Sequence, residues 1–124
     1  MSGSKLFLDT NIIIYFLSGD QTLSDLVDGK TIYVSFVTQL ELLSYHDLSV
    51  SEETRINDFL SHCVIVDINS AIKTTVIELR KTYRLKLPDS IIIASALHFD
   101  LPLITSDTAF KKVHELETVY YQKE

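Results

Sequence analysis

The sequence predicts a single α/β domain over residues 1–124: a parallel sheet of about four or five strands flanked by helices on both faces. Short apolar runs alternate with longer stretches whose apolar residues have helical spacing, and the connections are too short for other architectures. The first run, Lys5–Leu8, is apolar without helical periodicity, as expected for a strand buried on both faces. Hydrophobic residues make up 46% of the chain, which indicates a packed core rather than a disordered chain.

The same patterns place each element along the chain. The predicted strands are Lys5–Leu8, Thr31–Val34, Val64–Val66, Leu101–Thr105 and Thr118–Tyr121. The predicted helices cover residues 11–18, 21–28, 36–46 and 109–113, and three longer ones begin near residues 49, 69 and 88. Ser35 and Asn69 are N-cap residues for two of these helices, and Ser49 with Glu52 matches a capping box. Pro88 suits the first position of the sixth helix, which is apolar almost all round and therefore expected to be buried.

Composition limits the classes of function. The net charge of −6 argues against a nucleic-acid-binding protein that relies on general attraction, so RNA or DNA binding would need a local basic stripe or metal ions. The lone Cys63 excludes an internal disulfide framework and favours a reducing, cytoplasmic location. No apolar run reaches the length of a membrane span. Residues 1–4 lack the features of a signal peptide, and they could be native, tag-derived or disordered.

Four acidic residues stand out by position. Asp9 and Asp107 end two predicted strands, whereas Glu41 and Asp89 lie on helices with mostly apolar surroundings. Each has a simpler explanation: Asp9 and Asp107 as N-caps, Asp89 as a partner of the helix dipole, and Glu41 as a side chain reaching solvent. Brought to one sheet edge, four carboxylates would repel unless a divalent cation lay between them. Oxygen ligands suit Mg²⁺ or Mn²⁺, and the scattered His residues argue against zinc.

These residues lie in four motifs that together carry a family resemblance. The motifs are Leu8–Tyr15, Ser35-x-x-Thr38-x-x-Glu41-Leu42, Leu87–Ala94 and Leu103–Phe110. In this order they resemble the motifs of PIN-domain nucleases, and they span essentially the whole chain. The small single-domain size is similar to that of the VapC toxins of type II toxin–antitoxin pairs.

The resemblance implies a Mg²⁺- or Mn²⁺-dependent endoribonuclease in which a metal-activated water hydrolyses RNA phosphodiesters. It implies that Asp9, Glu41, Asp89 and Asp107 form the metal-binding and catalytic cluster. It also implies that Thr10 and Asn11 are supporting polar residues beside the acidic cluster. Thr105 or Ser106 would hold the metal-bound water in place. A cognate antitoxin protein and a homodimer are the implied partners. Two positions depart from the family pattern: Ala109 replaces a frequent Asp, and Ser106 stands where a basic residue is common.

Basic residues flank two of the four acids. Arg80, Arg84 and Lys86 precede Asp89, together with Lys81, and Lys111-Lys112 follows Asp107. Arg80, Arg84, Lys86 and Lys111 are predicted to track the RNA backbone as a basic rim. A solvated helix face explains the same charges equally well.

Three other functions stay open from the residues. The chain could be a housekeeping PIN-type RNA-processing nuclease rather than a toxin. A phosphatase with an aspartyl-phosphate intermediate is the second, because Asp9-Thr10-Asn11 begins like such a motif, although Asn11 stands where that chemistry needs a second acid. The third is a non-catalytic binding module, which should show no stabilisation by divalent metal ions.

Overall fold

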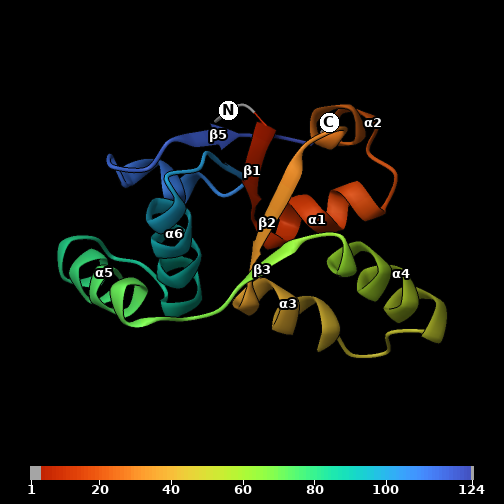
Figure 1. The fold of residues 1–124 in the computed structure, drawn as a ribbon, viewed down its shortest axis with the longest axis horizontal. Coiled ribbons are helices and arrows are strands. Elements are labelled where there is room, and N and C mark those ends of the chain that lie inside the picture. The colour runs from red at the N-terminus through yellow and green to blue at the C-terminus, as the bar shows by residue number, and fades with distance from the viewer. Residues whose placement is uncertain (1–3, 124) are drawn as a thin grey trace.

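A five-stranded parallel sheet forms the centre of the computed structural model, which describes residues 4–123 (Figure 1). Its strands are β1 (Lys5–Leu8), β2 (Thr31–Ser35), β3 (Val64–Val66), β4 (Leu103–Thr105) and β5 (Thr118–Tyr120). The strand order is β3-β2-β1-β4-β5, so β1 lies in the middle, between β2 and β4. The predicted α/β class and parallel sheet are confirmed.

Six α-helices and a short 3₁₀ segment connect the strands. They are α1 (Thr10–Leu17), α2 (Gln21–Val27), α3 (Phe36–Leu43), α4 (Val50–Ser61), α5 (Ser70–Thr82), α6 (Leu87–Phe99) and the 3₁₀ helix η2 (Thr108–Lys112). The predicted caps form: the Ser35 side chain accepts the Val37 N–H, and Asn69 accepts the Ile72 N–H. Ser49 and Glu52 form both hydrogen bonds of the capping box. Local side-chain chemistry therefore sets the N-termini of three helices.

Several predicted boundaries were wrong. Helix α3 ends at Leu43 rather than at His46, and the loop that follows turns through Asp47, whose φ is 63°. Strand β4 begins after Pro102, which has no N–H to donate to the ladder; its carbonyl accepts the Phe7 N–H instead. Helix α6 begins at Leu87, which places Pro88 second rather than first. The remaining boundaries differ from the predictions by one residue or two.

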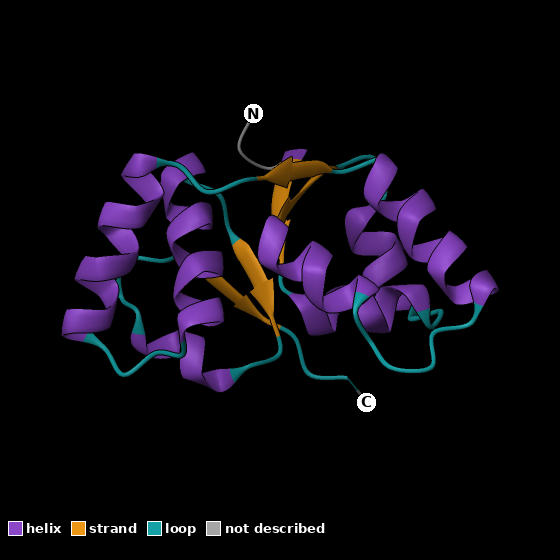
Figure 2. Cartoon of the chain, turned by 90° about the horizontal axis from the view of Figure 1, so that it is seen from below, coloured by secondary structure: helices purple, strands orange, loops and turns teal. Residues whose placement is uncertain are grey.

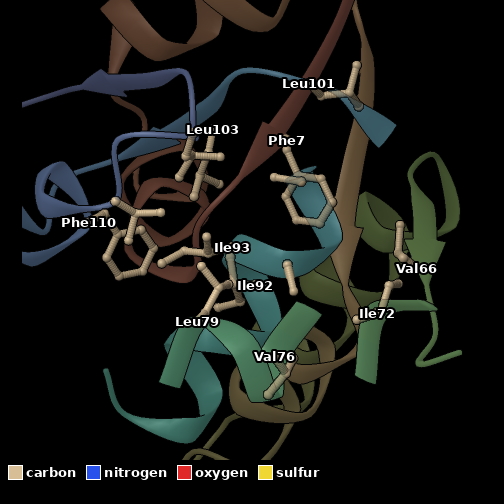
Figure 3. Packing of buried hydrophobic residues seen from close by; sticks show 14 residues of the cluster. Phe7, Val66, Ile72, Val76, Leu79, Ile92, Ile93, Leu101, Leu103 and Phe110 are labelled. Atoms are coloured by element: carbon tan, nitrogen blue, oxygen red, sulfur yellow. The ribbon is translucent and has the colours of Figure 1, made fainter. Parts of the chain in front are cut away.

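Helices cover both faces of the sheet, as predicted (Figure 2). Phe7 of β1 points to one face, where it packs with α5 and α6 (Figure 3). Leu6 and Leu8 point to the other face, against residues of α1, α2 and α4. Because alternate side chains of β1 enter two separate cores, the strand is packed on both faces up to its carboxyl end.

Some expectations need correction or fall outside the described residues. The apolar spacing of α3 predicts that Leu40 faces the core, but its side chain is 60% exposed. Residues 1–3 of the expected disordered N-terminus lie outside the described residues. Within residues 4–123, no helix combines the length and the apolar character that crossing a membrane requires.

Candidate active site

The strand order brings the four predicted acids to the carboxyl edge of the sheet. Asp9 directly follows the central strand β1, and Asp107 follows its neighbour β4. Helix α3, which carries Glu41, leaves the end of β2 on the other side of β1. Asp89 lies in the first turn of α6, and α6 packs against α3. In open parallel sheets, this edge is where ligands bind.

Asp9 is buried and held by hydrogen bonds to both of its carboxylate oxygens. One oxygen accepts the Thr10 N–H at 2.8 Å, and the other accepts the Thr105 hydroxyl at 2.7 Å. Thr105 in turn accepts the Asp107 N–H at 3.1 Å. Burial raises the pKa of Asp9, and these two hydrogen bonds oppose that change. The predicted N-cap role of Asp9 and its place in the acidic cluster therefore coexist.

Glu41 is connected to Asp9 through hydrogen bonds of Thr10. The Thr10 hydroxyl donates to Glu41 Oε1 at 2.7 Å, and its oxygen lies 2.9 Å from the Thr38 hydroxyl. Thr10 thus contacts Asp9 through its backbone N–H and Glu41 through its side chain. One residue at the start of α1 consequently fixes the relative orientation of two acids from different elements.

Electrostatic coupling shows that all four acids share one environment. The pKa of the half-buried Asp89 is raised to about 6, first by burial and then by the charges of Asp9 and Asp107. Glu41 raises this pKa further, and Lys86 lowers it. Asp107 and Glu41 also raise the pKa of Asp9. Such mutual repulsion is expected of a cluster that binds a cation.

The chemistry of the four carboxylates fits a hard divalent cation, although their side chains are not arranged in a coordination geometry. Among residues 4–123, no three His, Cys, Asp or Glu side chains stand in positions that could hold a metal ion. Several of the oxygens already accept hydrogen bonds: one Asp107 oxygen accepts the Ala109 N–H at 2.9 Å, and both oxygens of Asp9 have donors. Four carboxylates form an oxygen donor set that suits Mg²⁺ or Mn²⁺. Because each carboxylate oxygen has two lone pairs, these hydrogen bonds leave acceptor sites for a cation.

The structure distinguishes among the predicted companion residues. Thr105 contacts Asp9 directly, and Thr10 contacts both Asp9 and Glu41. Asn11 is exposed on α1, and Ser106 is partly buried beside Asp107. Thr38 was missed as a site residue, although its spacing of three residues from Glu41 places both on one side of α3.

The predicted basic residues lie on exposed surface near the start of α6. Arg80 and Arg84 line a groove of about 550 Å³, together with Lys81 and apolar side chains that include Ile77 and Leu87. Lys86 immediately precedes α6 and is close enough to lower the pKa of Asp89. Lys111 makes a cation–π contact instead, because its ammonium lies 4.0 Å from the centre of the Tyr120 ring.

Comparison with known proteins assigns the family. The family model described as "PIN domain" matches residues 6–116, so the chain belongs to the PIN domain family. Proteins of this family are nucleases, which act as hydrolases on nucleic acid. No curated protein matches the chain significantly.

Solved structures place the chain next to toxin–antitoxin proteins. A chain of a toxin–antitoxin complex from Klebsiella pneumoniae is 30% identical, with a TM-score of 0.79, and the match covers 92% of this chain and 95% of that one. VapBC2 from Rickettsia felis, bound to a DNA fragment from its promoter, shares 23% identity over 95% of this chain and 99% of that one, with a TM-score of 0.81. VapBC-1 from Haemophilus influenzae shares 22% identity over 94% and 97%, with a TM-score of 0.77. The resemblance to VapC-like PIN-domain toxins is confirmed.

Proposed function

We propose that this protein is a Mg²⁺- or Mn²⁺-dependent endoribonuclease and the toxin of a toxin–antitoxin pair. The observation that carries the proposal is the shared environment of Asp9, Glu41, Asp89 and Asp107, each from a different motif, at the carboxyl edge of the sheet. Family membership supports the nuclease activity, and the similarity to toxin–antitoxin complexes supports the toxin role.

The four acids are the proposed metal ligands. A bound Mg²⁺ or Mn²⁺ supplies a water of lowered pKa and neutralises charge on the scissile phosphate. Thr105 would keep Asp9 as an ionised acceptor, because its hydroxyl donates to that carboxylate. Thr10 would hold Glu41 towards Asp9. The raised pKa of Asp89 means that a cation beside it would offset the charges of its neighbours.

RNA is the proposed substrate, and the exposed cations are its proposed contacts. The acidic cluster by itself repels phosphate, so binding depends on positive charge beside it. Arg80 and Arg84 offer guanidinium groups in the groove near α6, and Lys86, which follows the groove residue Leu85 in the sequence, is close enough to Asp89 to lower its pKa. Lys111 would join them from η2 after leaving Tyr120. Backbone contacts of this kind position RNA without reading its sequence.

Two protein partners and a location complete the proposal. A cognate antitoxin is proposed from the similarity to toxin–antitoxin complexes. A homodimer is proposed because α3 and α5 expose large apolar side chains, Leu40 at 60% and Ile77 at 56%. A reducing cytoplasm suits the partly buried free Cys63.

The direct test is incubation of the purified protein with total RNA in Mg²⁺, in Mn²⁺ or in EDTA, followed by mapping of the cut ends. We expect cleavage with either metal, none in EDTA, and none by the Asp89→Asn protein. Cleavage by wild type without growth arrest on expression, and no inhibitory partner, would favour an RNA-processing nuclease. Neither cleavage nor stabilisation by divalent metal ions would favour a non-catalytic binding module.

A further inference from the structure

Helix α3 presents two polar side chains to the acidic cluster, but only one of them reaches solvent. Thr38 is fully buried, whereas Glu41, one turn later, is exposed. The Thr10 hydroxyl at the start of α1 lies between them, 2.9 Å from Thr38 Oγ1 and 2.7 Å from Glu41 Oε1. The three side chains form a continuous line from the interior to the cluster.

Proton counting fixes the direction of the hydrogen bonds along this line. An ionised carboxylate only accepts, so the single hydroxyl proton of Thr10 points to Glu41. The Thr10 oxygen must then accept from Thr38, because two hydroxyls cannot share a contact unless one donates. The order is therefore Thr38 to Thr10 to Glu41. A hydroxyl that accepts one hydrogen bond becomes a better donor in the next.

Thr38 also differs from other helical threonines in this chain. Those whose hydroxyls bond back to the carbonyl four residues earlier are Thr54, Thr74, Thr75 and Thr82. That bond satisfies the hydroxyl within its own helix and serves no distant group. The Thr38 hydroxyl instead faces Thr10, 28 residues away in the sequence. Packing alone does not require a hydroxyl there, since Val has the same shape.

Glu41 depends on this line for its orientation. Its long side chain is exposed and has several rotamers available, which a ligand role would restrict. Within residues 4–123, the hydrogen bond that holds its carboxylate comes from Thr10. We propose that Thr38 is a positioning residue: through Thr10 it holds the Glu41 carboxylate towards Asp9 and thereby strengthens divalent-metal binding. This inference rests on the proposed function, because it takes Glu41 as a metal ligand.

The test compares Mn²⁺ binding, measured by isothermal titration calorimetry, in wild type, Thr38→Val and Thr38→Ser. Loss of the hydroxyl in Thr38→Val is expected to weaken binding about 10-fold, as for other groups that orient metal ligands. Thr38→Ser keeps the hydroxyl and should bind within about twofold of wild type, a difference that implies little change in free energy. Thr75→Val is the matched control, because it removes a helical hydroxyl that bonds only within α5.

A double-mutant cycle separates positioning from a structural effect. In a Glu41→Gln background, Thr38→Val should have no further effect on Mn²⁺ affinity, since there is no carboxylate left to orient. If Thr38→Val fails to fold, Thr10→Ala breaks the same line one step later and should show the same loss and the same dependence on Glu41.

The outcomes distinguish this inference from the proposed function. Wild-type binding that Asp89→Asn abolishes but Thr38→Val leaves intact would overturn the role of Thr38 alone. An equal loss in Thr38→Val with and without Glu41 would also overturn it, because the effect would not pass through that carboxylate. A wild-type protein that binds no Mn²⁺ would overturn the proposed function and this inference together.

Discussion

Replacing Asp89 with Asn should stabilise the metal-free protein at neutral pH and remove its stabilisation by Mg²⁺. Asp89 is half-buried, and the charges of Asp9, Asp107 and Glu41 oppose its ionisation. Asn has nearly the same shape without the charge, so it relieves the repulsion while keeping the packing of α6. The same substitution removes a proposed metal ligand. Its effect on stability should therefore reverse once Mg²⁺ is present.

The magnitude follows from the pKa of Asp89. A rise from 3.8 to about 6 corresponds to roughly 3 kcal/mol of destabilisation of the ionised folded protein. Because the carboxyl group is only part-buried, solvent screening reduces this, and we expect about 1 kcal/mol, or about 4 °C in Tm.

The sign of the pH dependence is also determined. Between pH 3.8 and about 6 the folded state holds the Asp89 proton that the unfolded state has released. The contribution of Asp89 to stability is therefore fully present below this window, is lost as pH rises through it, and stays lost above pH 6.

Urea unfolding in EDTA at pH 4 and pH 7 measures this difference. Asp89→Asn and wild type should differ little at pH 4, and the variant should be more stable at pH 7. In Mg²⁺ at 100 times its Kd, wild type should gain about 2.7 kcal/mol and the variant should gain little. Asp58→Asn, an exposed change on α4, is the control. A variant that is no more stable than wild type at pH 7 in EDTA would refute the reasoning.

Three further predictions concern RNA, self-association and the antitoxin. Replacing Arg80 and Arg84 with Ala should flatten the salt dependence of RNA binding by about two units of slope at most. Replacing the exposed pair Lys5 and Lys73 with Ala should change this slope less. An unchanged slope in the arginine variant would mean that the two arginines only form a solvated helix face. Light scattering at high micromolar concentration should show a dimer, and a monomer would count against the proposed homodimer. A co-purified antitoxin should inhibit cleavage less as Mg²⁺ or salt rises, if a cationic side chain of its tail competes for the four carboxylates. Inhibition that is complete and indifferent to Mg²⁺ would place its contact elsewhere.

Features that depend on neighbouring residues could be predicted from the sequence. The caps at Ser35, Ser49 and Asn69 involve residues two or three positions away, and the structure contains them. The burial of α6 followed from its continuous apolar sequence. Asp9 and Asp107 could be placed together because strand ends in a parallel sheet share one edge, whereas Glu41 and Asp89 lie on helices and joined them through the family motifs. Their roles as metal ligands stay a prediction.

The remaining features depend on contacts between distant segments. The strand order β3-β2-β1-β4-β5 decides that Asp9 lies between the ends of β2 and β4, and residue patterns do not encode that order directly. Leu40 fits the apolar pattern of α3, yet it is exposed because none of the described elements covers that side. Thr38 looks like an ordinary helical threonine until the fold brings Thr10 within 2.9 Å. Hydrophobic periodicity and capping are local, whereas a hydrogen bond between residues 28 positions apart exists only once the chain has packed.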